Sequence, residues 1–554
     1  MGLQICKEDG PCCSQGTDAD TEAKIHHVPP SLAFQEDNGS FYGDLDSDRS
    51  PANLDEATLS KQLENSARLA RLPTESLAVH REPRGRISRL EQGGQLVVDS
   101  AVLRSVSLSS TLRRFGWLWR LRPNKMNEQQ LLNLFGKSKK SEELDIFFSH
   151  TWWTPGYRKY LSVLLSTFWH VALSAWFLSV VVVSLLYQVD VLPMPFVFWL
   201  SWADYQGQTA VAPWTLLVSS VVLHCSLHSA PLWASLLANS SCFYDAACIQ
   251  QVDPAQRERG IYGIGGFLAV TKEMRILWSP PYLSRLWCIF EIAAFRRANP
   301  IGRLTFQPLF LERDFLLIWP LTFAFMCAYF TFIVSANWAW LTIIPMAVCF
   351  ITFGPGIHGI RRSYLEQEQM LKDLAKFDVS TVSCANDFDK QFILEAISKW
   401  YGSVDAFNEY VRGPLKAELE QTVMNNRVPL SYVAYSVTPV FALTLDISIS
   451  LWKGSVPKEI FWRHFFGESL AAFMWSMFFI KVLHVLCRRG AAPRFKSRCM
   501  DYAQTTGLAI FWVVLNLIVN GAKVYFYRSS LVGAMLGFGV AAIVFIAMVY
   551  LSLR

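Results

Sequence analysis

The sequence predicts a multi-pass α-helical membrane protein with about eight spans and a cytosolic α/β domain. Three observations lead to this fold class. Of the 554 residues, 52% are hydrophobic and only 17% are charged, which is too apolar for a disordered, fibrous or ordinary soluble chain. Several runs of more than 20 residues contain no Asp, Glu, Lys or Arg. Between them lie segments with the strand–helix alternation of a parallel sheet.

Residues 1–115 are expected to form a disordered cytosolic tail that is first acidic and then basic. Residues 1–60 contain twelve acidic against three basic residues, which favours disorder over a packed core. Residues 61–140 contain sixteen basic against six acidic residues. Such a segment before a first span favours an anionic membrane surface, although a solvated linker explains the same charges. The net charge of +6 is too small to imply a nucleic-acid partner, so the expected partner is the lipid bilayer.

Eight crossings are counted from the apolar runs. Residues 161–189 are uncharged for 29 residues, more than the roughly 20 that cross a hydrocarbon core, and form the first span of a hairpin at 161–238. The second span is expected at about 213–237, after an outer loop. The 46 uncharged residues 315–360 correspond to about 69 Å of helix and predict two spans within 313–360. The last four spans are expected in a C-terminal membrane domain, 430–554, near 430–452, 465–486, 504–524 and 530–552.

The basic residues predict that both termini lie in the cytosol. Arg361 and Arg362 directly follow the fourth span, and the loop after the sixth span holds five Lys and Arg residues. The first two outer loops contain none. Because Lys and Arg are enriched in cytosolic loops, these sides are assigned to the cytosol.

Two cytosolic segments, 116–160 and 239–312, are predicted to form one split α/β domain. Residues 144–152 contain an acid, a short apolar run and a polar turn, which predicts a buried strand that leads into a loop. Residues 242–291 then alternate between strand and helix patterns. An even number of crossings between the two segments places both on one side of the membrane. Residues 361–429 are polar and helical in pattern, and are expected to pack on this domain or to pair between subunits.

Two motifs in these segments resemble those of TIR domains, which have a flavodoxin-like fold. Residues 145–150, Asp-Ile-Phe-Phe-Ser-His, resemble the first TIR strand. Residues 279–291 resemble the later signature, a Ser-Pro-x-Tyr turn followed by Trp-Cys-x-x-Glu. Residues 242–251 are similar to the strand and turn before the middle helix. The whole arrangement, with a membrane hairpin between the motifs, resembles a family of multi-pass proteins in dinoflagellate algae.

The TIR resemblance implies a possible enzymatic site. In catalytic TIR domains the signature glutamate, here Glu291, supports cleavage of the nicotinamide glycosidic bond of NAD by stabilising positive charge on the ribose. NAD is then the substrate, and the nucleotide cleft would be formed by Ser149, His150, Trp287 and Cys288. Trp287 and Glu291 lie one helical turn apart and so share a face. A structural carboxylate paired with a nearby arginine is the alternative, which leaves a signalling or scaffold module that self-associates.

Polar residues inside the predicted spans support two further hypotheses. His224 and His228 share one helix face, and His170 is expected at the same depth as His228, so a metal, haem or proton-relay site is one interpretation and interhelical hydrogen bonding is the other. Asp446 is the only carboxylate suited to a solute pathway. It carries the alternative function, a channel or transporter gated by the α/β domain.

Overall fold

The computed structural model describes residues 96, 100–202, 205–237, 240–334, 343–384, 386–425, 428–494 and 497–553. All of them belong to one unit of the chain, 46–554.

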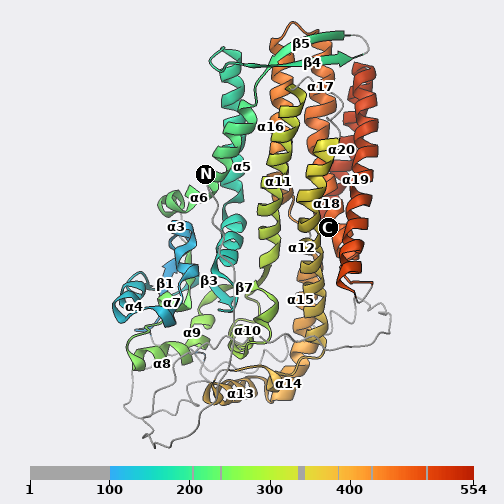
Figure 1. Ribbon diagram of the computed structural model, residues 1–554. Helices are drawn as coiled ribbons and strands as arrows, with labels where there is room; N and C mark the ends of the chain where they lie inside the picture. Colours follow the sequence, from blue (N-terminus) through green and yellow to red (C-terminus); the bar gives the residue numbers. More distant parts are fainter. Residues whose placement is uncertain are drawn as a thin grey trace, which may run out of the picture. The chain divides into compact units, whose positions relative to one another are not determined.

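Long apolar helices make up one part of this unit (Figure 1). Seven helical stretches in the described residues are long and apolar enough to cross a membrane, which suggests an integral membrane protein. They are α5 (Gly156–Gln188), α6 (Trp214–Leu237), α11 (Leu309–Val334), α16 (Leu430–Lys453), the continuous run α17 (Lys458–His464), η6 (Phe465–Leu470) and α18 (Ala471–Arg489), α19 (Arg498–Ser529) and α20 (Leu531–Leu553). Outward-facing side chains such as Ile518 and Ile543, 64% and 69% exposed, are compatible with contact to lipid.

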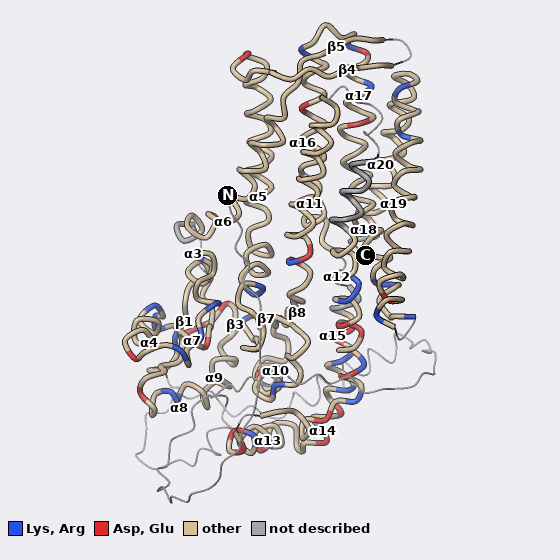
Figure 2. The backbone as a smooth tube through the Cα atoms, in the orientation of Figure 1, with Lys and Arg blue, Asp and Glu red and all other residues tan. Residues whose placement is uncertain are grey.

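The helices pack as neighbours, α5 on α6 and α11, α11 on α16, and α18 on α16 and α20. Figure 2 shows that Lys, Arg, Asp and Glu lie mainly at the helix ends and in the remaining, α/β part. The fourth predicted span, which is not among these seven, falls on α12 (Ile343–Ala375), and α12 follows residues 335–342, which lie outside the described part. An eight-span count therefore stays a prediction.

A β-hairpin connects α5 to α6, where the sequence predicted only an outer loop. Strands β4 (Phe196–Trp202) and β5 (Tyr205–Val211) pair antiparallel along their whole length. Phe198, Leu200 and Trp202 alternate inward and pack on the ends of α11 and α16. The hairpin thus covers one end of the helices with apolar side chains.

A six-stranded mixed sheet forms the centre of the α/β part. Its order is β2 (Lys139–Lys140), β1 (Arg104–Ser107), β6 (Ser241–Phe243), β3 (Leu144–His150), β7 (Thr271–Trp278) and β8 (Arg303–Pro308). The last four strands are parallel, whereas β1 pairs antiparallel with β2 and β6. In chain order the parallel strands run 2-1-3-4, the beginning of the flavodoxin-type order. Since β3 precedes and β6 follows the α5–α6 hairpin, that hairpin interrupts the sheet in sequence.

Part of the tail that the sequence predicted to be disordered is folded. Within the tail expected to be disordered to residue 115, residues 104–107 form β1 and α3 (Leu108–Arg120) follows directly. Val106, Leu108 and Leu112 are buried, and the Ser107 side chain caps the helix. The high density of arginine in this stretch concealed the few apolar positions that attach it to the sheet.

Helices cover the sheet and continue into the segment 361–429. The connections between the strands contain α4 (Glu128–Phe135), α7 (Asp245–Cys248), α8 (Pro254–Tyr262), α9 (Ile264–Ala269), the short turn η2 (Pro280–Tyr282) and α10 (Leu286–Ala298). The segment 361–429 adds the end of α12, α13 (Asp387–Tyr401), α14 (Val404–Tyr410), η5 (Val411–Leu415) and α15 (Lys416–Asn425), and α13 packs on α10. One hydrophobic core runs from Phe147 and Phe243 of the sheet to Phe315 of α11 and Val433 of α16. The sheet and the apolar helices therefore share a core.

Candidate functional site

The candidate site lies where β3 and β7 end. In a parallel sheet of this order, ligands bind outside the carboxyl ends of the strands at the point where the order reverses, which here is between β3 and β7. Ser149 and His150 end β3, and Cys288 and Glu291 lie on α10. The structure brings these four predicted residues together.

Glu291 accepts a hydrogen bond from Ser149, and the Ser149 hydroxyl in turn contacts that of Tyr282. The Ser149 hydroxyl donates to Oε2 of Glu291 and lies 2.5 Å from the Tyr282 hydroxyl. Ser149 and Tyr282 are fully buried, whereas Glu291 is partly accessible. Burial raises the pKa of Glu291 to about 8, although the Ser149 hydrogen bond opposes this shift. At neutral pH the carboxyl group is thus mainly protonated and ionises readily when a cation comes near.

A second polar cluster surrounds His150. Nζ of Lys159 lies 3.2 Å from Nδ1 of His150, and Oδ1 of Asp245 lies 3.7 Å from its Nε2. Trp152 donates from Nε1 to Oδ2 of Asp245 at 3.0 Å. Burial, assisted by the charge of Lys159, holds the pKa of His150 well below its usual value, so the imidazole is neutral. Burial also raises the pKa of Asp245, whose side chain is 33% exposed and forms the accessible end of the cluster.

Cys288 and Trp287, both predicted to line the nucleotide cleft, contact groups other than Glu291. Sγ of Cys288 lies 3.7 Å from the His150 carbonyl oxygen, and burial raises the pKa of this thiol well above its ordinary value, so it is not a thiolate nucleophile. Trp287 turns to α13, where Nε1 donates to Asp389 at 3.3 Å and the ring packs near Phe392. Trp287 therefore does not join Glu291 in a cleft. The prediction treated one helical turn as one surface, but α10 is buried on both sides.

Sequence reasoning missed Lys159, Asp245 and Tyr282 as members of the site. Asp245 lies two residues after the end of β6, and Ser149 and His150 end β3. This shared position at the carboxyl end of neighbouring strands was an available signal. Lys159 lies in the first turn of α5 and is only 2% exposed. In the sequence it marked only the last charge before an apolar run.

His170, His224 and His228, on α5 and α6, are not placed to hold a metal ion together. His170 is exposed beside Trp169, whereas His228 bonds the Tyr160 hydroxyl at 2.9 Å. His224 lies 3.1 Å from the Ser220 carbonyl and 3.3 Å from the Tyr435 hydroxyl. Among the residues that the structure describes, no group of three or more His, Cys, Asp or Glu side chains is placed to hold a metal ion. His224 and His228 instead connect helices by hydrogen bonds, the other interpretation of the sequence.

Asp446 caps the first turn of α6. Its Oδ1 accepts from the Thr215 N–H at 2.9 Å and from the Tyr187 hydroxyl at 3.0 Å, and its Oδ2 accepts from the Leu216 N–H at 2.9 Å. These N–H groups belong to the first turn of α6, where a carboxylate is stabilised by unpaired donors and the helix dipole. Asp446 is 1% exposed. The structure thus gives Asp446 a helix-capping role, and the channel hypothesis stays a prediction.

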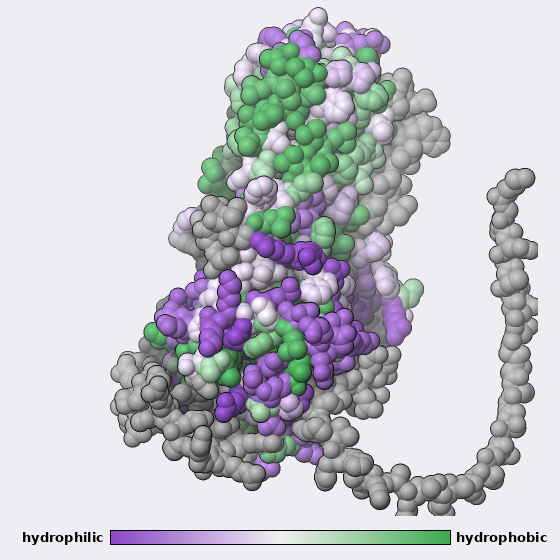
Figure 3. Space-filling view, turned by 90° about the vertical axis from the view of Figure 1, so that its left-hand side faces the viewer, coloured by the Kyte–Doolittle hydropathy of each residue, from purple (hydrophilic) through white to green (hydrophobic). Residues whose placement is uncertain are grey.

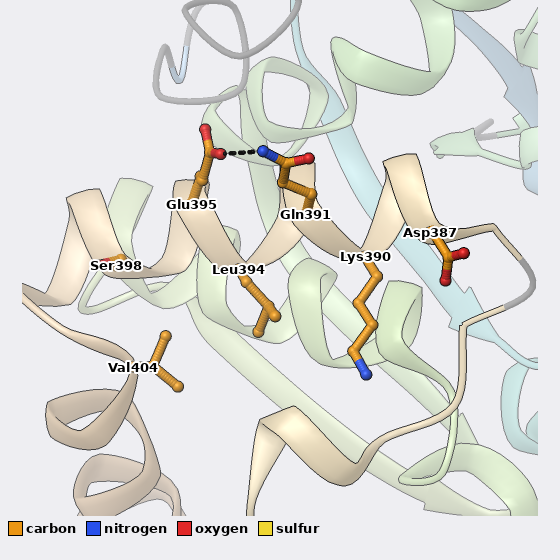
Figure 4. A pocket seen from close by; sticks show the side chains of 7 residues that line it. All are labelled: Asp387, Lys390, Gln391, Leu394, Glu395, Ser398 and Val404. Carbon is orange, nitrogen blue, oxygen red and sulfur yellow. Dashed lines mark hydrogen bonds between the residues drawn. The ribbon is translucent and has the colours of Figure 1, made fainter.

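A separate open pocket of about 520 Å³ lies along α13 (Figure 4). It is lined by Asp387, Lys390, Gln391, Leu394, Glu395, Ser398 and Val404. Gln391 donates to Glu395 at 2.9 Å, so part of the polar lining is already paired. None of the residues around Glu291 lines it.

Comparisons of the chain with family models, with curated proteins and with solved structures found no match. The strand order by itself is shared by proteins of many unrelated functions. Function is therefore inferred from the residues at the carboxyl ends of β3 and β7.

Proposed function

We propose that the chain is an integral membrane protein with a cytosolic TIR-like signalling module whose site at Glu291 cleaves NAD. The observation that carries the proposal is the contact between Ser149 and Glu291. These residues belong to the two separate TIR-like motifs, and they meet at the switch point of a 2-1-3-4 parallel sheet. A partly accessible carboxyl with a strongly raised pKa at such a position is characteristic of functional sites.

The reaction is hydrolysis of the bond between nicotinamide and ribose. As this bond breaks, its electron pair passes to the nicotinamide nitrogen, which becomes neutral, and positive charge develops on the ribose. Ionised Glu291 stabilises that charge, and water then adds to the anomeric carbon and releases a proton. Since Glu291 has a pKa of about 8 in the free protein, activity should rise as the pH rises toward 8, and the positively charged nicotinamide ring of NAD favours ionisation at lower pH.

The test is nicotinamide release from NAD by the full chain in detergent or nanodiscs. Wild type is compared with Glu291→Gln and with Glu409→Gln, which removes an exposed carboxylate on α14. Several protein concentrations are needed because self-association is part of the proposal. We expect turnover by wild type and the control, and a loss of at least about 100-fold in Glu291→Gln.

Absence of turnover by folded protein at every concentration would contradict the hydrolase and leave a binding or scaffold module. Turnover that persists in Glu291→Gln would contradict the assignment of the residue.

A further inference from the structure

A bend in α3 presents basic and aromatic side chains. Arg114, Phe115 and Gly116 have positive φ angles of 52°, 53° and 65°, a conformation that side chains other than glycine seldom adopt. The bend turns Phe115 outward, so that its side chain is 65% exposed. Trp117, two residues on, is 39% exposed. A large apolar ring on the surface points to a partner that covers it.

The bend lies beside the ends of two apolar helices. A Cβ atom on Gly116 would approach Tyr160 of α5 to 2.3 Å, and one on Gly156 would approach the Trp119 carbonyl oxygen to 1.9 Å. The backbone of α3 is therefore in direct contact with the first turns of α5. The Phe115 ring also lies 5.5 Å from that of His228 on α6.

This position coincides with the boundary between polar and apolar sequence. The last charge of α5 is Lys159, after which residues 161–189 carry none. On α6, Pro231 lies inside the helix near its end, and Leu232 and Trp233 are 55% and 63% exposed. Figure 3 views the side on which Figure 1 shows α3, α5 and α6, with a hydrophobic region above a hydrophilic one.

The charges at the bend have one sign. Arg113, Arg114 and Arg120 are exposed, and residues 108–120 contain no Asp or Glu. Arginine beside tryptophan at a hydrocarbon boundary is the composition that contacts phosphate and glycerol groups of lipids. We define the α3–α6 surface as Arg113, Arg114, Phe115, Trp117, Arg120 and Trp233.

We propose that the α3–α6 surface binds the headgroups of anionic phospholipids. The arginines contact the phosphates, and Phe115, Trp117 and Trp233 enter the interface beside α5 and α6. A lipid is favoured over a protein partner because the surface adjoins helices that the bilayer itself would cover. The function of this surface is to fix the α/β sheet relative to the membrane, and it does not depend on whether Glu291 cleaves NAD.

The experiment uses the full chain in nanodiscs that contain a photoreactive phosphatidylserine or a photoreactive phosphatidylcholine. The readout is the lipid fraction that gives half-maximal labelling of the peptide 108–120. The test variant is Arg113→Gln with Arg114→Gln and Arg120→Gln. The matched control, Lys372→Gln with Lys376→Gln and Lys399→Gln, removes the same charge from exposed positions on α12, just after it and on α13.

Each basic side chain near an anionic surface contributes about a fivefold change in binding, so the triple arginine variant should need on the order of 100-fold more phosphatidylserine. Wild type and the lysine control should behave alike, and phosphatidylcholine should label the peptide weakly. Phe115→Ala with Trp117→Ala keeps the charge and should reduce labelling severalfold.

Three results would overturn the proposal. They are equal labelling of wild type and the arginine variant, equal labelling by the two lipids, and loss of labelling on addition of inorganic phosphate at constant ionic strength, which would indicate a free-anion site. Circular dichroism of each nanodisc sample ensures that only folded protein is compared.

Discussion

Replacing Asp446 with alanine should destabilise the membrane helices strongly. The carboxylate accepts two N–H groups from α6 and the Tyr187 hydroxyl, all of them buried. Each buried donor left without an acceptor costs about 1–3 kcal/mol, so three donors give about 3–6 kcal/mol when partial relaxation is allowed. Asp446→Asn keeps one carbonyl oxygen and should lose about half as much. Tyr187→Phe removes a single hydrogen bond and should cost about 1 kcal/mol.

The assay is the free energy of unfolding in mixed detergent micelles, measured for the three variants beside wild type. The expected order of destabilisation is Asp446→Ala, then Asp446→Asn, then Tyr187→Phe. The decisive comparison adds solute flux in proteoliposomes. If Asp446→Ala were as stable as wild type, or if Asp446→Asn folded normally but abolished a flux, the helix-cap assignment would be refuted and Asp446 would line a pathway.

Three further predictions concern other parts of the chain. Because the pKa of Glu291 rises from 4.5 to about 8 on folding, the native state binds more protons between these pH values, and wild-type stability should fall as pH rises through them. The stability of Glu291→Gln should lack this pH dependence. Its free energy of unfolding, measured with denaturant, should therefore rise relative to that of wild type by up to about 5 kcal/mol between pH 4 and pH 9. Gly116→Ala should lower the free energy of unfolding by about 2–4 kcal/mol, since φ is positive and the new Cβ would meet Tyr160. Gly521→Ala, where the new Cβ would enter open space, should be neutral or stabilising in the same denaturant unfolding experiment. Glu312→Ala removes the acceptor of three buried donors and should lower the melting temperature in detergent, equivalent to about 3 kcal/mol; an unchanged melt would show that water replaces the carboxylate.

The long helices could be predicted from the sequence because uncharged runs leave few alternatives. The last predicted span, 530–552, differs from α20 by one residue at each end. The β4–β5 hairpin could not be recognised in the same way. Its outward positions include Val197 and Trp199, which are 50% and 47% exposed, so the alternation between apolar and polar residues that marks a half-buried strand is absent.

The candidate site was only partly predictable for a topological reason. Ser149 and Glu291 were named through their motifs, but Asp245 and Lys159 join the site because β6 lies beside β3 and α5 turns back over the strand end. Strand order is not encoded in local patterns. The same limit explains why the prediction for Trp287 was incomplete. Its spacing of four residues from Glu291 predicts a shared helix face, but only the position of α13 shows that Trp287 contacts α13 and not the site.

The apolar helices are connected to the sheet too closely to be a passive anchor. Strand β8 ends at Pro308 and α11 begins at Leu309, with no loop between them. Beside this junction, Gln307 donates to Ser162 Oγ of α5 at 2.7 Å, and Ser162 donates to Glu312 of α11 at 2.9 Å. Tyr432 of α16 donates to the same carboxylate at 3.2 Å. Five residues separate β3, which carries Ser149 near its end, from α5. Buried hydrogen bonds therefore join α5, α11 and α16 to the end of β8, and a short connection joins α5 to the strand that contacts Glu291.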